Sequence, residues 1–245
     1  MSPDEYLVHV RSAGAALAEA ASKDLAAPVT GCPGWTTGRL TAHVGEVHQW
    51  AGEMIRTRTL DSIDFRSLPS PPEGDALIPW FTAGVERIAT TLEEAGLDAP
   101  VWNWGEAPKT SAFWYRRMAE ETTVHRWDAQ DAVGDAAPID TPLAVEGIDE
   151  LLLVLGRRIR ATEPLARERT TIHLHATDTE GEWLITVAGT NVETTHGHAK
   201  GDVALRGAAS DLLLFLWKRV APDRPGNEVF GDASVLDEWT QKIKL

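Results

Sequence analysis

Apolar residues recur with a helical period through the first half of the chain. This pattern predicts helices over 3–25, from a cap at Thr36 or Thr37 to about Arg58, over 76–95, and from a cap at Thr110 or Ser111 to about Val133. The intervening segments are rich in proline, glycine and small polar residues, which is typical of loops. Four amphipathic helices joined by loops indicate a four-helix bundle.

The pattern changes in the second half. After a linker that follows Gly134, a fifth helix is expected over 142–160, with Thr141 as its cap. Alternation with period two then predicts strands, the first two forming a hairpin: 171–178, 182–189, 192–196 and 202–207. Helices are expected over 209–220 and 234–243. We therefore expect an α+β protein with a boundary near residue 140 or 160, divided into a bundle at 1–140 and an α+β domain at 141–245.

Composition narrows the classes of protein. The chain has 245 residues, 43% of them hydrophobic, which is enough for a buried core. Its net charge of -14 disfavours electrostatic binding to nucleic acid or to anionic membranes. No apolar run reaches the roughly 20 residues that cross a bilayer, and the start lacks the pattern of a signal peptide. Cys32 is the single cysteine, so no internal disulfide can form. A cytoplasmic location is expected.

Helical phase selects one histidine of the second predicted helix. If Leu40 is placed at angle zero and each residue advances by about 100°, Val44, Ala51 and the other apolar residues form one stripe. His43 falls within this stripe, on one flank, whereas His48 falls at the opposite margin. We therefore expect His43 to face the bundle interior and His48 to be a border residue.

The fourth predicted helix places an acid and a base one turn apart. Met118, Glu121, His125, Asp128 and Ala132 follow the spacing of one helical face. A buried carboxylate without a partner is costly, and a metal bound between facing helices removes that cost. His43, Glu121 and His125 are therefore candidate ligands for zinc, iron or nickel, with an open coordination position. A solvated Glu121 and a core histidine at position 125 remain the alternative.

Further residues are weaker candidates. Asp128 can orient a metal ligand, although a surface or capping role is equally compatible with its position. Arg206 and Arg219 flank an apolar helix and can bind a substrate carboxylate, although surface charge explains them more simply. Cys32 lies in a loop before the metal helix, and we favour a structural role for it. If the open position held a water for hydrolysis, Glu120, Asp128 or His48 would be candidate general bases.

Two pairs of histidines have the i, i+2 spacing of a strand. They are His173 with His175 and His196 with His198. They can form a second metal site if their strands pair. The interpretation that we favour is two polar faces directed to solvent, with Ile172 and its alternating neighbours directed inward.

Two segments resemble the mycothiol-dependent maleylpyruvate isomerase family, which belongs to the wider DinB-like four-helix metalloproteins. They are GCPGWTTGRLTAHVGEVHQWA, with Pro33–Thr36 before Ala42–His43, and EETTVHRWDAQDAVG, which contains the run Glu121–Asp128. The C-terminal segments TIHLHATDTEGEW and ALRGAASDLLLFLWKR are similar to the smaller domain of the family. The resemblance places the family's metal ligands on His43, Glu121 and His125.

The resemblance implies a metal-dependent enzyme that uses mycothiol, the thiol of actinobacteria, for isomerisation or thiol transfer on a small organic substrate. Zinc is the expected metal, and nickel or iron is possible. A monomer or homodimer is expected, without a nucleic-acid or membrane partner. The alternatives are a metal-dependent hydrolase and a non-catalytic module that binds a thiol or small molecule, with the C-terminal domain forming a sterol-carrier-like pocket.

Overall fold

A computed structural model describes residues 1–105, 108–154, 160–162, 165 and 167–244. The chain divides into two compact units, Met1–Ala137 and Pro138–Leu245. Within these residues, no helix combines the length and the apolar character that spanning a membrane would need.

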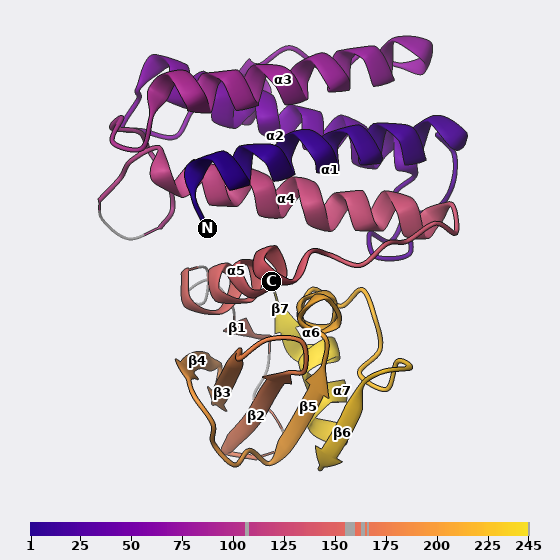
Figure 1. Ribbon diagram of the computed structural model, residues 1–245, viewed down its shortest axis with the longest axis vertical. Helices are drawn as coiled ribbons and strands as arrows, with labels where there is room; N and C mark the ends of the chain where they lie inside the picture. The colour runs from indigo at the N-terminus through magenta and orange to yellow at the C-terminus, as the bar shows by residue number, and fades with distance from the viewer. Residues whose placement is uncertain (106–107, 155–159, 163–164, 166, 245) are drawn as a thin grey trace. The chain divides into compact units, whose positions relative to one another are not determined.

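The N-terminal unit is a helix bundle (Figure 1). Its long helices are α1 (Pro3–Lys23), α2 (Thr37–Thr57), α3 (Leu77–Ala95) and α4 (Ala112–Ala132). Helix α1 packs on α4 and α3, and α2 packs on α3 and α4. The short 3-10 turns Phe65–Ser67 and Gly74–Ala76 lie in the connection between α2 and α3. In the part of the chain that the structure describes, the predicted four-helix bundle is confirmed.

The helix starts follow local capping chemistry. Ser2 and Glu5 form a reciprocal capping box at the start of α1. Thr36 caps α2 by accepting a hydrogen bond from the backbone N–H of Arg39. Ser111 occupies the cap position of α4, but its hydroxyl donates to the carbonyl of Gly96 instead of capping the helix. The expected cap positions are therefore correct, while the role of Ser111 is different.

The buried face of α2 is rotated from the predicted one. Its buried residues include His48, and their mean direction lies about 50° further round the helix than that of the apolar stripe. Gly45 lies on this face, and its lack of a side chain lets the indole of Trp80 on α3 approach the helix closely. The prediction that His48 is a border residue is therefore wrong, because His48 is 1% exposed. His43 lies at the edge of the buried face, with a side chain that is 28% exposed.

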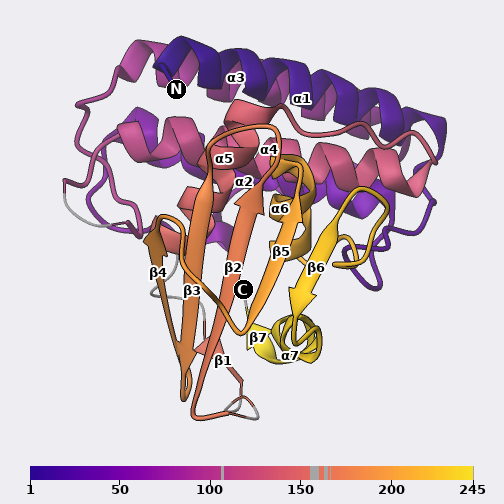
Figure 2. The same ribbon diagram turned by 60° about the horizontal axis from the view of Figure 1, so that its bottom comes forward.

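The C-terminal unit is a mixed sheet with helices (Figure 2). Its helices are α5 (Thr141–Asp149), followed by a π-helical turn (Glu150–Val154), α6 (Ala209–Leu216) and α7 (Ser234–Lys242). Its strands are β1 (Arg160–Ala161), β2 (Arg169–Ala176), β3 (Glu182–Ala188), β4 (Asn191–His196), β5 (Val203–Gly207), β6 (Glu228–Gly231) and β7 (Ile243–Lys244). The described strands are ordered β6-β5-β2-β3-β4-β1-β7. The predicted smaller α+β part is confirmed.

The centre of this sheet follows the predicted alternation. Strands β2 and β3 form the expected antiparallel hairpin, and β5 pairs with β2 in parallel. Ile172, Leu174 and Trp183 are fully buried on one face. On that side, Trp183 Nε1 donates a hydrogen bond to Asp149 Oδ1 at the end of α5. The helical side of the sheet is therefore the one that carries the core.

Several boundaries differ from the predictions. The fifth helix does not reach residue 160, because Arg160 belongs to β1, and residues 155–159 lie outside the described residues. Thr141 does not cap this helix; its hydroxyl donates to Asp178 Oδ2 instead. The helix expected to end at residue 220 ends at Leu216, just before Lys218 adopts a left-handed conformation. Strands β1, β6 and β7 were not predicted, because two to four residues are too few to show a period.

Candidate functional site

The three residues selected as metal ligands lie together in the bundle. His43 belongs to α2, whereas Glu121 and His125 lie one turn apart on the facing helix α4. The carboxylate oxygen Oε1 of Glu121 lies 3.5 Å from His43 Nε2 and 3.4 Å from His125 Nε2. A ligand atom of each of the three residues lies within 4.8 Å of those of the other two. The two helices thus direct two imidazoles and one carboxylate toward a common point.

These separations suit a tetrahedral divalent ion. Zinc binds imidazole nitrogen and carboxylate oxygen at about 2.0–2.2 Å, so two ligands of one tetrahedron are separated by about 3.4 Å. The measured separations of 3.4 and 3.5 Å from Glu121 Oε1 match that edge. Three protein ligands leave one position open, as in catalytic zinc sites. The residues present therefore fit a divalent metal without rearrangement of Glu121 Oε1.

The second carboxylate oxygen of Glu121 has a partner of its own. Arg117, one turn earlier on α4, places Nη2 2.5 Å from Oε2 of Glu121. Burial alone would raise the pKa of Glu121, but Arg117, His125 and His43 together hold it well below the usual range. Glu121 is therefore an anion, with Oε2 held by arginine and Oε1 available to the histidines. The guanidinium of Arg117 also removes part of the desolvation cost that suggested a metal.

His125 is oriented from behind by Asp128. Its Nδ1 lies 2.9 Å from Asp128 Oδ2, and Asp128 is buried, which excludes a surface role for this aspartate. The carboxylate fixes Nδ1 as a proton donor, which directs Nε2 toward the metal position. Burial alone would lower the pKa of His125, but Asp128, Cys32 and Glu121 raise it well above its usual value. A metal must therefore displace a proton from this imidazole in order to bind.

The loop before α2 supplies Cys32 and Trp35 to the same site. Its turns are closed by backbone hydrogen bonds from Cys32 to Val29 and from Trp35 to Cys32. Cys32 Sγ lies 3.7 Å from Asp128 Oδ2, the oxygen that also meets His125. The indole of Trp35 packs edge-on against His43, with ring centroids 4.9 Å apart. The loop before α2 thus brings the thiol of Cys32 and the indole of Trp35 to the site.

Sequence reasoning missed part of this site. It treated Cys32 as structural and did not single out Arg117 or Trp35. The i, i+4 spacing of Arg117 and Glu121 is a signal that could have found the arginine. The family segment contains Cys32 and Trp35, but the spacing of its residues does not show that they reach the triad, because their approach depends on how the loop folds back.

The remaining candidates lie elsewhere. His48 Nε2 contacts Thr122 Oγ1 at 2.8 Å, and its ring stacks on Phe81 instead of joining the triad. In the C-terminal unit, Arg206 pairs with Glu228 on the neighbouring strand, and Arg219 donates to the carbonyl of Trp217. A role of either arginine in binding a substrate carboxylate stays a prediction.

Comparisons with known proteins cover both units. Residues 7–130 match the family model of the mycothiol maleylpyruvate isomerase N-terminal domain, and residues 142–238 match the MDMPI C-terminal domain. No curated protein matches the sequence.

Solved structures show the same fold at low sequence identity. A mycothiol-dependent maleylpyruvate isomerase is 13% identical, with a TM-score of 0.59 over 94% of this chain and 93% of the other. A histidine-to-alanine mutant of such an isomerase is 14% identical, with a TM-score of 0.63 over the same shares. Both family models, one after the other along the chain, place this protein in the mycothiol maleylpyruvate isomerase family of enzymes.

Proposed function

We propose that this protein is a metal-dependent enzyme that uses mycothiol to isomerise a small organic substrate or to transfer a thiol to it. His43, Glu121 and His125 are the proposed metal ligands, and zinc is the ion that suits them best. The convergence of both Nε2 atoms on Glu121 Oε1, at the spacing of a tetrahedral site, is the observation that carries the proposal. Family membership supplies the thiol.

Each residue around the site has a separable task. Asp128 holds the ring of His125 with Nε2 toward the shared point. Arg117 balances the charge of Glu121 and fixes its carboxylate, so that Oε1 does not turn away. Trp35 limits the movement of His43 and covers one side of it. When bound, the ion supplies a positive charge that lowers the pKa of a thiol at the open position.

A thiolate is a good nucleophile for either proposed reaction. It can add to an activated double bond, which becomes a single bond, and leave again after rotation; this is cis–trans isomerisation. It can instead displace a leaving group, which leaves carbon bound to sulfur. The substrate experiment therefore includes acceptors for both reactions.

Hydrolysis is the alternative that the contacts favour less. Of its candidate bases, Asp128 is engaged by His125, and His48 meets Thr122 and Phe81. Neither contact leaves a carboxylate or imidazole poised beside the shared point. Glu120 is buried on α4, outside the His43–Glu121–His125 group. The non-catalytic thiol-binding module and the sterol-carrier-like role of the C-terminal unit become outcomes of the same test.

The test compares wild type with His125→Ala and with His9→Ala, a histidine of α1 that is outside the site. After removal and reloading of zinc, each protein is assayed for bound zinc and for turnover with and without mycothiol. The acceptors are a panel of cis unsaturated acids and of electrophiles. We expect His125→Ala to bind one equivalent of zinc fewer and to lose mycothiol-dependent turnover, whereas His9→Ala keeps both.

Other outcomes contradict the proposal in distinct ways. Turnover that needs zinc but no thiol would show a hydrolase. Mycothiol binding without turnover on any acceptor would show a binding module. Equal zinc content in wild type and His125→Ala would remove the metal site from this position. Circular dichroism spectra have to establish that the variants are folded.

A further inference from the structure

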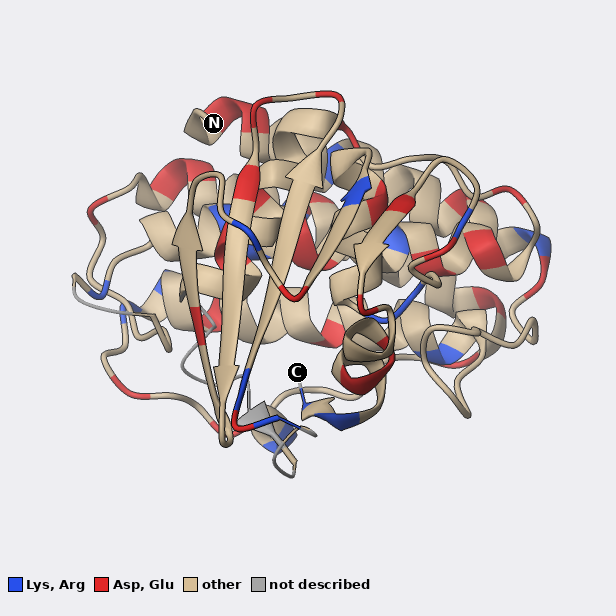
Figure 3. Ribbon diagram, turned by 90° about the horizontal axis from the view of Figure 1, so that it is seen from below, with Lys and Arg blue, Asp and Glu red and all other residues tan. Residues whose placement is uncertain are grey.

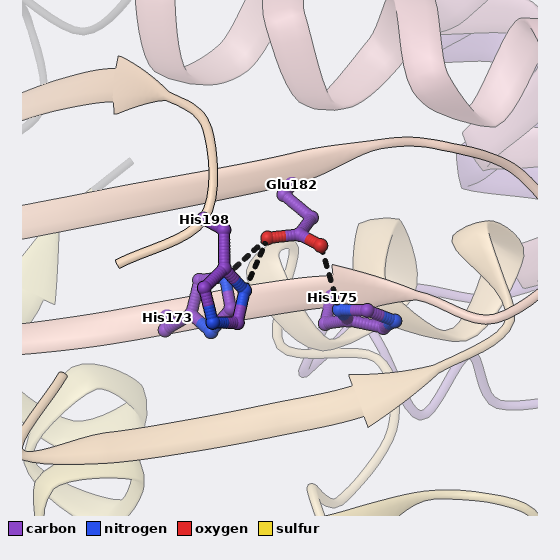
Figure 4. A group of neighbouring side chains, drawn as sticks. All are labelled: His173, His175, Glu182 and His198. Carbon is purple, nitrogen blue, oxygen red and sulfur yellow. Dashed lines mark hydrogen bonds and ion pairs between the residues drawn. The ribbon is translucent and has the colours of Figure 1, made fainter. Parts of the chain in front are cut away.

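Four side chains gather on the sheet of the C-terminal unit, apart from the triad of the bundle. His173 and His175 lie on β2, Glu182 begins β3, and His198 follows the end of β4. The register places His175 directly opposite Glu182 in the hairpin, and His173 projects on the same face two residues earlier. Figure 3 views this sheet from the side opposite α5 and α6, and Figure 4 shows the cluster itself.

The carboxylate of Glu182 lies at the centre of this cluster (Figure 4). Its Oε2 atom lies 3.2 Å from His173 Nε2 and 2.8 Å from His198 Nδ1, and its Oε1 atom lies 3.0 Å from His175 Nδ1. The rings of His173 and His198 are perpendicular, with centroids 5.1 Å apart. One ligand atom from each of the four residues lies within 4.8 Å of the others.

The cluster has the charge and exposure that a cation site needs. Burial lowers the pKa of His173, against an opposing effect of the carboxylate of Glu182. Burial alone would raise the pKa of Glu182, but His198 and His173 lower it overall, so that the carboxylate is anionic. The side chain of His173 is almost buried, whereas that of His198 is 79% exposed, so the cluster is shielded from solvent at His173 and open to solvent at His198.

The cluster is open to solvent on one side. The side chain of His198 is 79% exposed and that of His175 is 33% exposed. An ion in solution can therefore reach these two imidazoles without any movement of the strands.

We propose that His173, His175, Glu182 and His198 form a second divalent metal site, selective for zinc or a similar transition metal. Three imidazoles and one carboxylate match the donors that zinc prefers and are a poor match for magnesium or calcium. Four protein ligands complete a tetrahedral shell, which is typical of a structural rather than a catalytic zinc site. The proposal is independent of the reaction proposed for the bundle.

The site would join three parts of the sheet. Two ligands belong to β2 and one to β3, so the hairpin holds them at fixed spacing. His198 belongs to the connection that leaves β4 and returns to β5 beside β2. A metal ion would clamp this connection onto the hairpin. We therefore expect bound zinc to stabilise this unit, because a ligand that binds only the folded state adds to its stability.

The structure also selects among the histidines of the sequence pattern. His196 lies on the other face of the sheet, where its Nε2 meets Asp149 Oδ1 at 3.2 Å. The two i, i+2 pairs therefore do not form one site together; Glu182 takes the place of His196. The expectation that His173 points to solvent is wrong, because its side chain is 6% exposed.

The test measures zinc binding in a protein whose bundle site has been removed by His43→Ala and His125→Ala. We expect this double variant, the background protein, to bind one equivalent of Zn²⁺ and not to bind Mg²⁺ at millimolar concentration. Adding His175→Ala and His198→Ala should weaken zinc binding at least tenfold. His196→Ala, the matched control on β4, should leave it unchanged. Cobalt substitution should give the visible absorption of a tetrahedral ion in the background and not in the His175/His198 variant.

Two results would overturn the proposal. One is a background protein that binds no zinc, which would mean that Glu182 merely accepts hydrogen bonds from three imidazoles. The other is equal zinc affinity after His175→Ala and His198→Ala. Because both altered histidines are partly or mostly exposed, the variants should remain folded, and Glu182→Gln provides a second variant with the same expected loss. Loss of turnover in the bundle variants has no bearing on this outcome.

Discussion

His48 should make the folded bundle sensitive to acid. Its imidazole is enclosed between helices, with Nε2 at 2.8 Å from Thr122 Oγ1 and its ring stacked on Phe81. The hydroxyl of Thr122 donates to the carbonyl of Met118, so it accepts the proton of His48 Nε2. Among the described residues Nδ1 has no hydrogen-bond partner. A proton added there would therefore create a buried charge without an acceptor.

The magnitude follows from the pKa of His48. Burial lowers it from 6.5 to about 4, against a smaller opposing effect of Glu121. Above pH 6.5 both folded and unfolded states hold a neutral imidazole, and no penalty exists. Between pH 6.5 and 4 the unfolded chain binds a proton at His48 and the folded chain does not, so stability decreases as the pH is lowered. The loss is about 2 kcal/mol between pH 7.5 and 5.0, and about 3 kcal/mol at its limit.

Urea unfolding of metal-free protein measures this loss. Wild type, His48→Gln and the control His9→Gln are compared at pH 7.5 and 5.0. The transition that is followed is the urea unfolding transition whose midpoint changes in His48→Gln. Between pH 7.5 and 5.0 the free energy of unfolding of His48→Gln should fall by about 2 kcal/mol less than that of wild type, because glutamine can donate to Thr122 and does not titrate. His9→Gln should keep the wild-type loss. Equal pH dependence in wild type and His48→Gln would refute the reasoning, as would an NMR titration that gives His48 a pKa near 6.5.

Two further predictions concern the bundle. Asp128→Asn removes the charged partner of His125 and should weaken zinc binding at the bundle site by about 10–100-fold, measured against a chelator; unchanged affinity would mean that Asp128 does not orient the ligand. Gly45→Ala places a Cβ 2.2 Å from the indole of Trp80, so urea unfolding should show a loss of about 1–3 kcal/mol. Gly52→Ala, whose Cβ would have ordinary contacts, should cost nothing; equal effects of both substitutions would contradict the packing argument.

The helical half of the fold is well encoded in local sequence. Capping residues and apolar period placed the ends of α1 to α4 within a few residues, because both signals act inside one helix. The direction of the buried face was less predictable. Gly45 lets Trp80 approach α2 closely, and His48 is buried together with the apolar stripe instead of lying at its border. The pattern of apolar residues does not include glycine, although the close approach of Trp80 to α2 depends on the missing side chain of Gly45.

The C-terminal unit shows the same division. Period two found the long central strands, whereas β1, β6 and β7 are defined by their partners rather than by any pattern of their own. The register of β2 with β3, which places His175 opposite Glu182, then determined which residues belong to the histidine cluster. Sequence spacing grouped His196 with His198, but β4 ends at His196, and the connection after it brings His198 to Glu182 while His196 contacts Asp149.

The sequence by itself determined the family, the helices and the spacing of Glu121 and His125 one turn apart. These are properties of neighbouring residues, which helical geometry fixes within about 6 Å. Only the tertiary structure decided that Glu121 Oε1 meets His43 across the bundle, that Arg117 holds the other oxygen, and that the loop returns Cys32 to Asp128. Those contacts join atoms up to 96 positions apart in the chain, and their distances follow from how helices and loops pack.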